Sequence, residues 1–327
     1  MHQAIPTKDL ILLYLKENKG KWISGQSLSN KIEVTRSAIW KHIQRLREDG
    51  YIIRSSPNKG YLLQKSSEML LPNEIKEDLA TAVFGKGDIF HFKEADSTNT
   101  KAKELADRGA VEGTLVISEK QTSGRGRKGR SWFSPSQEGI YISLILRPSI
   151  SPSEAPKTTL LTAVAVAETL LSLTQLQVSI KWPNDILVGG KKIAGILTEI
   201  SAEMDTIDYI VVGLGLNVNT PDFPDDIKDK ATSILIETGK YFHRVDIIKE
   251  YLKQYEKYYE ILGRIGFKPI IKRWKELTNI IGRWITVEAT NIEYTGEVQD
   301  IDKDGVLILK DDRGKLHRIF SGDVILV

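Results

Sequence analysis

The sequence predicts an α+β fold in three parts, and three local patterns support this prediction. Apolar side chains recur at helical spacing in residues 8–49, strands alternate with helices in residues 89–277, and the final fifty residues alternate apolar and polar side chains at period two. The 327 residues suffice for two or three domains. We expect these domains at residues 1–66, 67–277 and 278–327.

The composition excludes several classes of protein. Cysteine is absent, so the chain has no disulfide framework and no thiolate nucleophile or thiolate metal site. The apolar run near the N-terminus is too short and too interrupted for a signal peptide, and no segment has the length of a membrane span. We therefore expect a cytoplasmic protein, and the sequence suggests no built-in metal site.

The basic charge is concentrated at the N-terminus. Residues 1–63 contain 11 basic and 5 acidic side chains, whereas the remainder contains 35 basic and 38 acidic ones. This asymmetry indicates that only the first part of the chain meets a polyanion.

The N-terminal part predicts three helices followed by a hairpin. The helices are expected at residues 8–19, 26–31 and 35–49. Thr35 would cap the third helix, and Gly50 suits the left-handed position after its end. Its buried stripe is predicted to be Ile39, Ile43 and Leu46. Two short strands in residues 51–63 flank a Pro-Asn-Lys-Gly turn, and this order of elements is that of a winged helix-turn-helix.

The outward face of the third helix carries the candidate DNA-binding side chains. They are Arg36, Ser37, Lys41 and Arg45. Such residues contact phosphates and base edges in the major groove. Solvated surface charge, or a helix-turn-helix that contacts another protein, remains the alternative. The order of elements together with the local charge favours DNA binding.

The rest of the chain predicts a mixed sheet with helices and then a small all-β barrel. Residues 64–74 suggest a linker. Strands are expected at residues 89–93, 113–121, 139–148, 178–201 and 209–219, with 178–201 forming two strands around the turn Gly189–Gly190. Helices are expected at residues 97–109, 154–173, 245–262 and 269–277. The final strands turn at Asp304–Gly305 and Arg313–Gly314.

The segment QTSGRGRKGRSWFSPSQEG, residues 121–139, satisfies the dinucleotide pattern G-x-G-x-x-G. A helix should open at the last glycine, but Pro135 and turn-forming residues follow instead, so a nicotinamide-dependent oxidoreductase is rejected. A Walker loop also fails, since no Gly-Lys-Ser/Thr ends the run. A glycine-rich loop remains, which places Arg125, Arg127, Lys128 and Arg130 around an anion. A compact phosphate ligand is favoured over nucleic acid, because the surrounding body is acidic. It is favoured over a merely solvated loop, because four clustered cations repel one another when nothing is bound.

Two further segments carry unusual residues. Lys181 and Asp185 flank a Trp-Pro-Asn turn, and Lys192 lies between two apolar stretches. A buried lysine must meet an anion or lose its charge, although a lysine at a strand end is also commonly exposed. The strand that holds GLGLNVN contains Gly213 and Gly215, and glycine in a strand marks close approach by a ligand or another backbone.

The motifs DSTNT, QTSGRGRKGRSWFSP, KWPNDILV, KKIAGIL and GLGLNVN follow one another in this order. Together they resemble the bacterial bifunctional biotin–protein ligases that also repress the biotin operon, and the resemblance covers the whole chain. It implies a central domain like the class II synthetases and a C-terminal SH3-like barrel. It also implies activation of biotin by ATP, as MgATP, to biotinoyl-5′-AMP. Transfer to a lysine of biotin carboxyl carrier protein, the acceptor in acetyl-CoA carboxylase, or of another biotin-accepting domain would follow.

The same resemblance assigns roles to residues by motif. It implies Lys192, Arg125 and Arg127 as catalytic cations. It implies biotin and adenylate contacts from Ser97, Thr98, Asn99, Gln121, Arg125, Gly126, Arg127, Trp132, Lys181, Asn184, Lys192, Gly195 and Asn217. Asp185 would orient Lys181 or hold Mg²⁺.

The resemblance further implies operator DNA as a partner and a homodimer when biotinoyl-AMP is bound. Two alternatives stay open at this point. One is a lipoate or octanoate ligase, which has the same reaction logic. The other is a ligand-sensing repressor without catalysis, against which the arginine-rich loop and Lys192 both argue.

Overall fold

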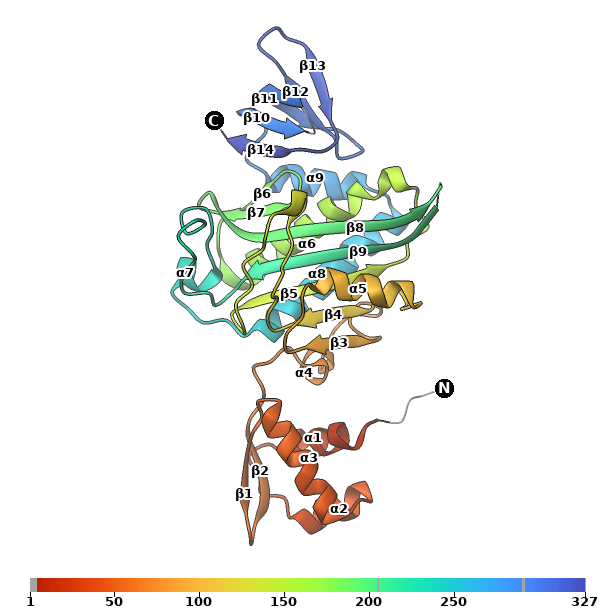
Figure 1. Cartoon of the computed structure of the whole chain (residues 1–327), viewed down its shortest axis with the longest axis vertical. Coiled ribbons are helices and arrows are strands. Elements are labelled where there is room, and N and C mark those ends of the chain that lie inside the picture. The colour runs from red at the N-terminus through yellow and green to blue at the C-terminus, as the bar shows by residue number, and fades with distance from the viewer. Residues whose placement is uncertain (1–4, 205, 290–291, 327) are drawn as a thin grey trace. The chain divides into compact units, whose positions relative to one another are not determined.

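A computed structural model describes residues 5–204, 206–289 and 292–326 of the chain (Figure 1). The chain forms two compact units, Met1–Glu77 and Asp78–Val327. Each unit is described by itself below.

The first unit is the predicted winged helix-turn-helix. Its elements are α1 (Thr7–Glu17), α2 (Gly25–Ile32), α3 (Arg36–Glu48), β1 (Ile52–Ser56), β2 (Gly60–Lys65) and α4 (Pro72–Lys76). Thr35 caps α3 as expected, because its hydroxyl accepts a hydrogen bond from the Ala38 amide at 3.2 Å. The predicted stripe of Ile39, Ile43 and Leu46 is fully buried. Gly50 follows α3 with a φ of +87°, and β1 and β2 pair as the antiparallel wing.

The segment expected to be a plain linker is instead ordered and packed, so that prediction is wrong. Met69 and Leu71 join the apolar core of the first unit, and α4 follows them. Glu74 of α4 is buried, where its carboxylate pairs with Lys16 at 2.7 Å and accepts from the Tyr51 hydroxyl at 2.6 Å. Burial and this carboxylate raise the pKa of Tyr51. The compact unit thus continues to Glu77, while the domain limits 1–66, 67–277 and 278–327 stay a prediction.

The second unit is built on a seven-stranded mixed sheet of order β3-β4-β5-β9-β8-β7-β6. Its strands are β3 (Ile89–Phe92), β4 (Leu115–Ser118), β5 (Gly139–Leu146), β6 (Val178–Lys181), β7 (Asp185–Val188), β8 (Lys191–Glu203) and β9 (Thr206–Asn217). Only the pair β3–β4 is parallel within this sheet. Residues 178–201 hold parts of three strands, not two. Pro183 lacks the N–H that a strand ladder uses, and the Trp182–Asn184 turn separates β6 from β7.

Helices cover the sheet on both faces. They are α5 (Thr98–Asp107), α6 (Pro156–Thr174), α7 (Ile234–Thr238), α8 (Arg244–Arg264) and α9 (Lys268–Leu277), with short 3₁₀ turns η1 (Arg127–Gly129) and η2 (Pro152–Glu154). Helix α5 packs on β4, β5 and β9 from one side, whereas α6, α8 and α9 lie on the other side (Figure 1). All eight residues of β5 are therefore buried. Because α5 is short, it leaves the centre of its own face of the sheet free for a site.

The C-terminal part is an SH3-like antiparallel sheet of order β13-β12-β11-β10-β14. Its strands are β10 (Trp284–Ala289), β11 (Ile292–Ile301), β12 (Leu307–Lys310), β13 (Leu316–Ile319) and β14 (Asp323–Leu326). The two predicted turns are confirmed, since Gly305 and Gly314 have φ values of +84° and +80°.

Across the described ranges of the chain, no helix combines the length and the apolar character needed to cross a membrane.

Candidate active site

The centre of the site is a patch of glycines on β8 and β9. Gly195 lies opposite Gly215 in the antiparallel register. Gly213 lies two residues before Gly215, on the same face of β9. A methyl group at Gly215 would overlap the Trp132 indole, and one at Gly213 would overlap the Asn99 amide. The close approach predicted from these glycines exists, and in this structure the side chains of Trp132 and Asn99 make it. The strand glycines thus leave space for the side chains of Trp132 and Asn99 to lie directly on the sheet.

A polar hollow lies where α5 begins. Ser97, Thr98 and Asn99 are all buried there. The Thr98 amide donates to Gln121 Oε1 at 2.8 Å, and Asn99 Nδ2 donates to Leu197 O at 3.1 Å. The hydroxyl of Ser143 on β5 lies 2.8 Å from Thr98 Oγ1 and 2.6 Å from Asn99 Oδ1. These contacts fix an array of amide and hydroxyl groups around the hollow.

The polar hollow is small in this conformation. Its volume is about 40 Å³, well below the roughly 300–1,000 Å³ that is typical of ligand cavities. Its lining includes Gln121, Arg125, Gly126, Asn184 and Trp132. The Trp132 indole, which lies over the glycine patch, is one of the side chains that limit this space.

The glycine-rich loop forms a tight hairpin above this hollow. The Trp132 amide donates to Gly124 O at 2.8 Å, and the Gly126 amide donates to Arg130 O at 2.7 Å. Arg125 pairs with Glu199 of β8 at 2.9 Å. These backbone hydrogen bonds fix the conformation of the loop, and the ion pair fixes the position of the Arg125 side chain.

Arg127 reaches from the loop to two distant segments. Its guanidinium donates to Asn184 Oδ1 at 3.1 Å, to Gly322 O at 3.2 Å and to Ser321 Oγ at 3.2 Å. Asn184 is held in turn by its own bond to Ile196 O at 2.9 Å. Through these contacts the C-terminal sheet positions an arginine that lines the polar hollow.

Asp323, at the start of β14, forms ion pairs with three cations of the glycine-rich loop. Its carboxylate lies 2.6 Å from Arg130, 3.2 Å from Lys128 and 3.7 Å from Arg127. Burial alone would raise its pKa, but the Lys128 hydrogen bond and the arginine charges hold the pKa below its usual 3.8. This carboxylate offsets the mutual repulsion of the loop cations.

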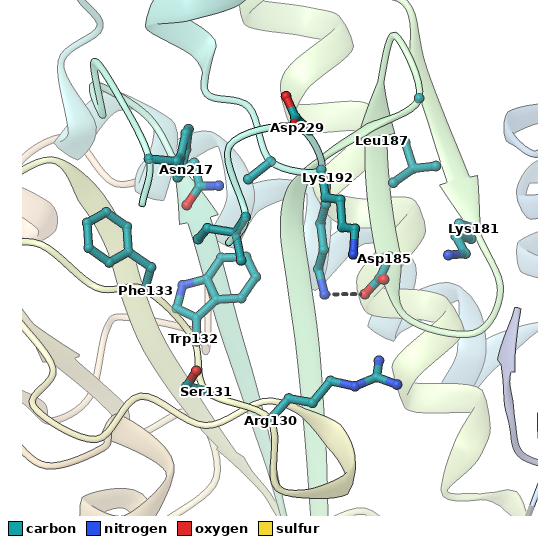
Figure 2. Close-up of a pocket in the computed structure, with 15 residues that line it drawn as sticks. Arg130, Ser131, Trp132, Phe133, Lys181, Asp185, Leu187, Lys192, Asn217 and Asp229 are labelled. Carbon is teal, nitrogen blue, oxygen red and sulfur yellow. Dashed lines mark ion pairs between the residues drawn. The ribbon is translucent and has the colours of Figure 1, made fainter. Parts of the chain in front are cut away.

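A second, larger cavity of about 420 Å³ adjoins the polar hollow and shares Trp132 and Lys192 with it (Figure 2). Lys192 Nζ lies 5.2 Å from the centre of the Trp132 ring and pairs with Asp185 Oδ1 at 2.7 Å. The Lys192 side chain is 33% exposed, so it is neither a free surface lysine nor a buried one. Asp185 therefore pairs with Lys192, and it also lies opposite Lys181 in the register of β6 and β7. Its expected role, to orient Lys181 or to hold Mg²⁺, stays a prediction.

The remaining walls of this cavity are basic and aromatic. Lys181 ends β6, and burial lowers its pKa. Phe133 meets Phe223 edge-on at 6.1 Å, and Asn217 donates to Thr232 O at 2.9 Å. A volume of 300–1,000 Å³ is typical of ligand cavities, and cations beside aromatic rings suit a nucleotide.

Lys128 of the loop lines neither cavity, but the structure brings together every residue that the resemblance assigns to the biotin and adenylate site. Those in the polar hollow are Ser97, Thr98, Asn99, Gln121, Arg125, Gly126, Arg127, Asn184 and Gly195; Lys181 and Asn217 line the larger cavity, and Trp132 and Lys192 line both. Arg36, Ser37, Lys41 and Arg45 are exposed on α3 in the first unit.

Sequence reasoning missed Ser143, Glu199 and Asp323, which hold these residues in place. Each is an ordinary polar residue in a strand, with no local pattern to mark it. Only the pairing of distant segments shows what they contact. Within the described residues, no three His, Cys, Asp or Glu side chains gather in a way that could hold a metal ion.

Two curated relatives match most of the chain. The bifunctional ligase/repressor BirA of Bacillus subtilis strain 168 is 41% identical over 321 residues, which is 98% of both chains. The biotin–[acetyl-CoA-carboxylase] ligase of Paracoccus denitrificans is 31% identical over 227 residues, 67% of this chain and 93% of the relative. This chain belongs to the bifunctional biotin ligase/repressor family.

Domain profiles and a solved structure support the same family. Residues 92–217 match the biotin/lipoate A/B protein ligase family, residues 7–62 an HTH domain, and residues 280–327 the biotin protein ligase C-terminal domain. The biotin protein ligase from Aquifex aeolicus in complex with biotin and ATP superposes with a TM-score of 0.64. It shares 29% identity and covers 73% of this chain and 97% of its own. Membership of the bifunctional biotin ligase/repressor family therefore favours a biotin ligase over the alternative of a lipoate ligase.

Proposed function

We propose that the chain is an ATP-dependent biotin–protein ligase and a biotinoyl-AMP-dependent repressor of biotin genes. One observation carries the ligase proposal: a polar hollow and a basic, aromatic cavity adjoin and share Lys192 and Trp132. A reaction that joins a small polar acid to a nucleotide needs two such compartments with a cation at their junction.

The ring system of biotin would bind in the polar hollow. Its ureido group offers donors and acceptors that match Ser97, Thr98, Asn99 and Gln121. Because the hollow is small and the Trp132 indole covers Gly195 and Gly215, we propose that the indole moves off these glycines when biotin binds. The indole would then form a wall between the two substrates.

ATP, as MgATP, would occupy the larger cavity, with Asn217 near the adenine and Lys181 and Asn184 near the phosphates. A carboxylate oxygen of biotin attacks the α-phosphorus, the α–β phosphoanhydride bond breaks, and pyrophosphate leaves. Lys192, Arg125 and Arg127 would neutralise the anions that this step brings together. Lys192 would exchange Asp185 for phosphate and carboxylate oxygens.

In the second step, the neutral ε-amine of an acceptor lysine attacks the acyl carbon of biotinoyl-5′-AMP. The acyl–phosphate bond breaks, AMP leaves, and the new amide nitrogen loses a proton. The acceptor would be the biotin carboxyl carrier protein of acetyl-CoA carboxylase or another biotin-accepting domain. The hairpin above the hollow would exclude water from the mixed anhydride meanwhile.

The repressor half rests on the winged helix-turn-helix. Arg36, Ser37, Lys41 and Arg45 are exposed on α3, as a recognition helix requires. We propose that the biotinoyl-AMP form dimerises and binds an operator with two half-sites, because a two-fold dimer presents paired recognition helices. The site of action would be the cytoplasm, where the bacterial DNA lies.

The ligase proposal is tested by the intact mass of a single-lysine acceptor domain after incubation with the protein, biotin and MgATP. We expect a gain of one biotin, and at least a roughly 100-fold slower gain for Lys192→Ala. The matched control is Lys191→Ala, since Lys191 is the exposed neighbour on the same strand. No gain with folded, biotin-binding protein would leave a sensor-repressor, and a preference for lipoate in competition would leave a lipoate ligase.

A further inference from the structure

An exposed tryptophan stands on the recognition helix. Trp40 of α3 keeps 55% of its surface exposed, although it sits beside the fully buried Ile39. It lines a groove of about 580 Å³ between α3 and the wing, together with Arg36, Ser37 and Pro57. Large apolar side chains on the surface are common singly, so exposure alone proves nothing. The contacts of the indole decide what it can do.

The only polar atom of the indole is already engaged inside the module. With its amide oxygen directed toward both donors, Gln44 accepts from Trp40 Nε1 at 3.3 Å and from Arg47 at 3.0 Å. Arg47 also donates to Ile53 O at 2.7 Å and to Ser55 Oγ at 2.6 Å, both on β1. The indole is therefore tied to the wing, and the surface that it leaves exposed is hydrocarbon.

The surroundings of Trp40 identify the occupant of the groove as DNA. Arg36 and Lys41 are exposed beside it on α3, and within the described part of the chain neither has an ion-pair partner. An apolar surface framed by unpaired cations matches the floor of a major groove framed by phosphates. A protein partner would instead need a broader apolar patch.

We infer that Trp40 reads the C5-methyl groups of thymines in the operator. Among the base edges that line the major groove, thymine is the one that presents an apolar group, and small apolar side chains recognise it by direct contact. An indole whose N–H is satisfied cannot hydrogen-bond a base, so it selects this group. The inference rests on the proposed repressor function and adds a residue that determines its sequence preference.

The test begins with duplexes selected from a random-sequence pool by the full-length protein with biotin and MgATP. Each thymine of a selected duplex is then replaced by deoxyuridine, which lacks only the methyl group. We expect the wild type to lose about fourfold in affinity at the contacted thymine, the factor for one buried methyl-sized group. Trp40→Ala should bind thymine and deoxyuridine duplexes equally, and Trp40→Phe should keep part of the preference.

Trp22→Ala is the matched control. Trp22 belongs to the same module, is partly exposed and lies under Lys59 of the wing turn, but it does not line the groove. Its replacement should leave the response to deoxyuridine unchanged.

The outcomes separate this inference from the proposed function. If no duplex is enriched, the proposed DNA binding and the inferred role of Trp40 are both contradicted. If duplexes are enriched but deoxyuridine has no effect, or has the same effect on Trp40→Ala, the repressor stands and the role of Trp40 is overturned.

Discussion

The glycine-rich loop at residues 125–130 and the recognition helix α3 each carry four basic side chains, yet they hold this charge differently. The loop cations contact the protein's own carboxylates, Glu199 for Arg125 and Asp323 for its neighbours. On α3, Arg36, Lys41 and Arg45 have no ion-pair partner among the described residues.

The difference indicates which kind of anion each segment suits. Carboxylates fix the loop cations in a partly enclosed site, so they are preorganised for a compact phosphate or carboxylate. Exposed cations on a helix suit a long polyanion, because neutralising successive phosphates releases condensed counterions. Similar local charge therefore serves two ligands of different size.

Removal of Arg127 gives the largest effect that we expect on the loop side. Arg127→Ala should slow biotinoyl-AMP formation roughly 100-fold, because a cation aimed at developing charge is lost. Pyrophosphate release measures this step. Lys128→Gln is the control within the same loop. Lys128 contacts Glu288 O and Asp323, and it lines neither the polar hollow nor the larger cavity. Equal losses in both variants would mean that the loop acts only through its total charge.

A methyl group on the glycine patch tests the floor of the site. Gly215→Ala should lower the unfolding free energy by about 1–3 kcal/mol, because the methyl overlaps the Trp132 indole in the ligand-free fold. It should also weaken biotin binding about tenfold, because the methyl occupies the floor that the ligand needs once the indole has moved. Calorimetric titration and thermal denaturation measure the two effects. Gly263→Ala, in α8 with open space around it, should be neutral or slightly stabilising. Unchanged biotin binding in Gly215→Ala would mean that the ligand does not use the glycine patch as its floor.

Removal of a cation from α3 tests the other side of the comparison. Lys41→Ala should weaken binding to all duplexes similarly and reduce the slope of log affinity against log salt by about 1. Arg130→Ala should leave this slope unchanged, because Arg130 is paired with Asp323. A change of slope in Arg130→Ala would place the loop on DNA as well.

The smallest effect that we expect is the pH dependence of the stability that the ion pairs of Asp323 contribute. Its pKa is depressed in the folded protein, so its ion pairs stabilise the fold above the unfolded pKa of about 3.9 and are lost as pH falls through the folded value. The melting temperature of the wild type should exceed that of Asp323→Asn near neutral pH, and the difference should vanish in acid. A difference that persists at low pH would contradict the role of the ion pairs.

Local patterns in the sequence predicted most elements of the fold. The cap at Thr35, the stripe of α3 and the turns at Gly305 and Gly314 follow from interactions within a few residues. The sequence patterns did not predict α4, nor that the predicted Trp-Pro-Asn turn separates two strands, β6 and β7. The first depends on burial of Glu74 against Lys16 and Tyr51, which are distant in the chain.

By itself, the sequence determined the order of elements and the residue types of the site, since glycine, arginine and lysine carry their chemistry wherever they are placed. Only the tertiary structure decided the partners. Asp185 pairs with Lys192, Asp323 meets a loop almost two hundred residues earlier, and Trp132 lies on Gly195 and Gly215. These contacts depend on which strands pair and on how distant segments pack, and the local pattern of apolar residues specifies neither.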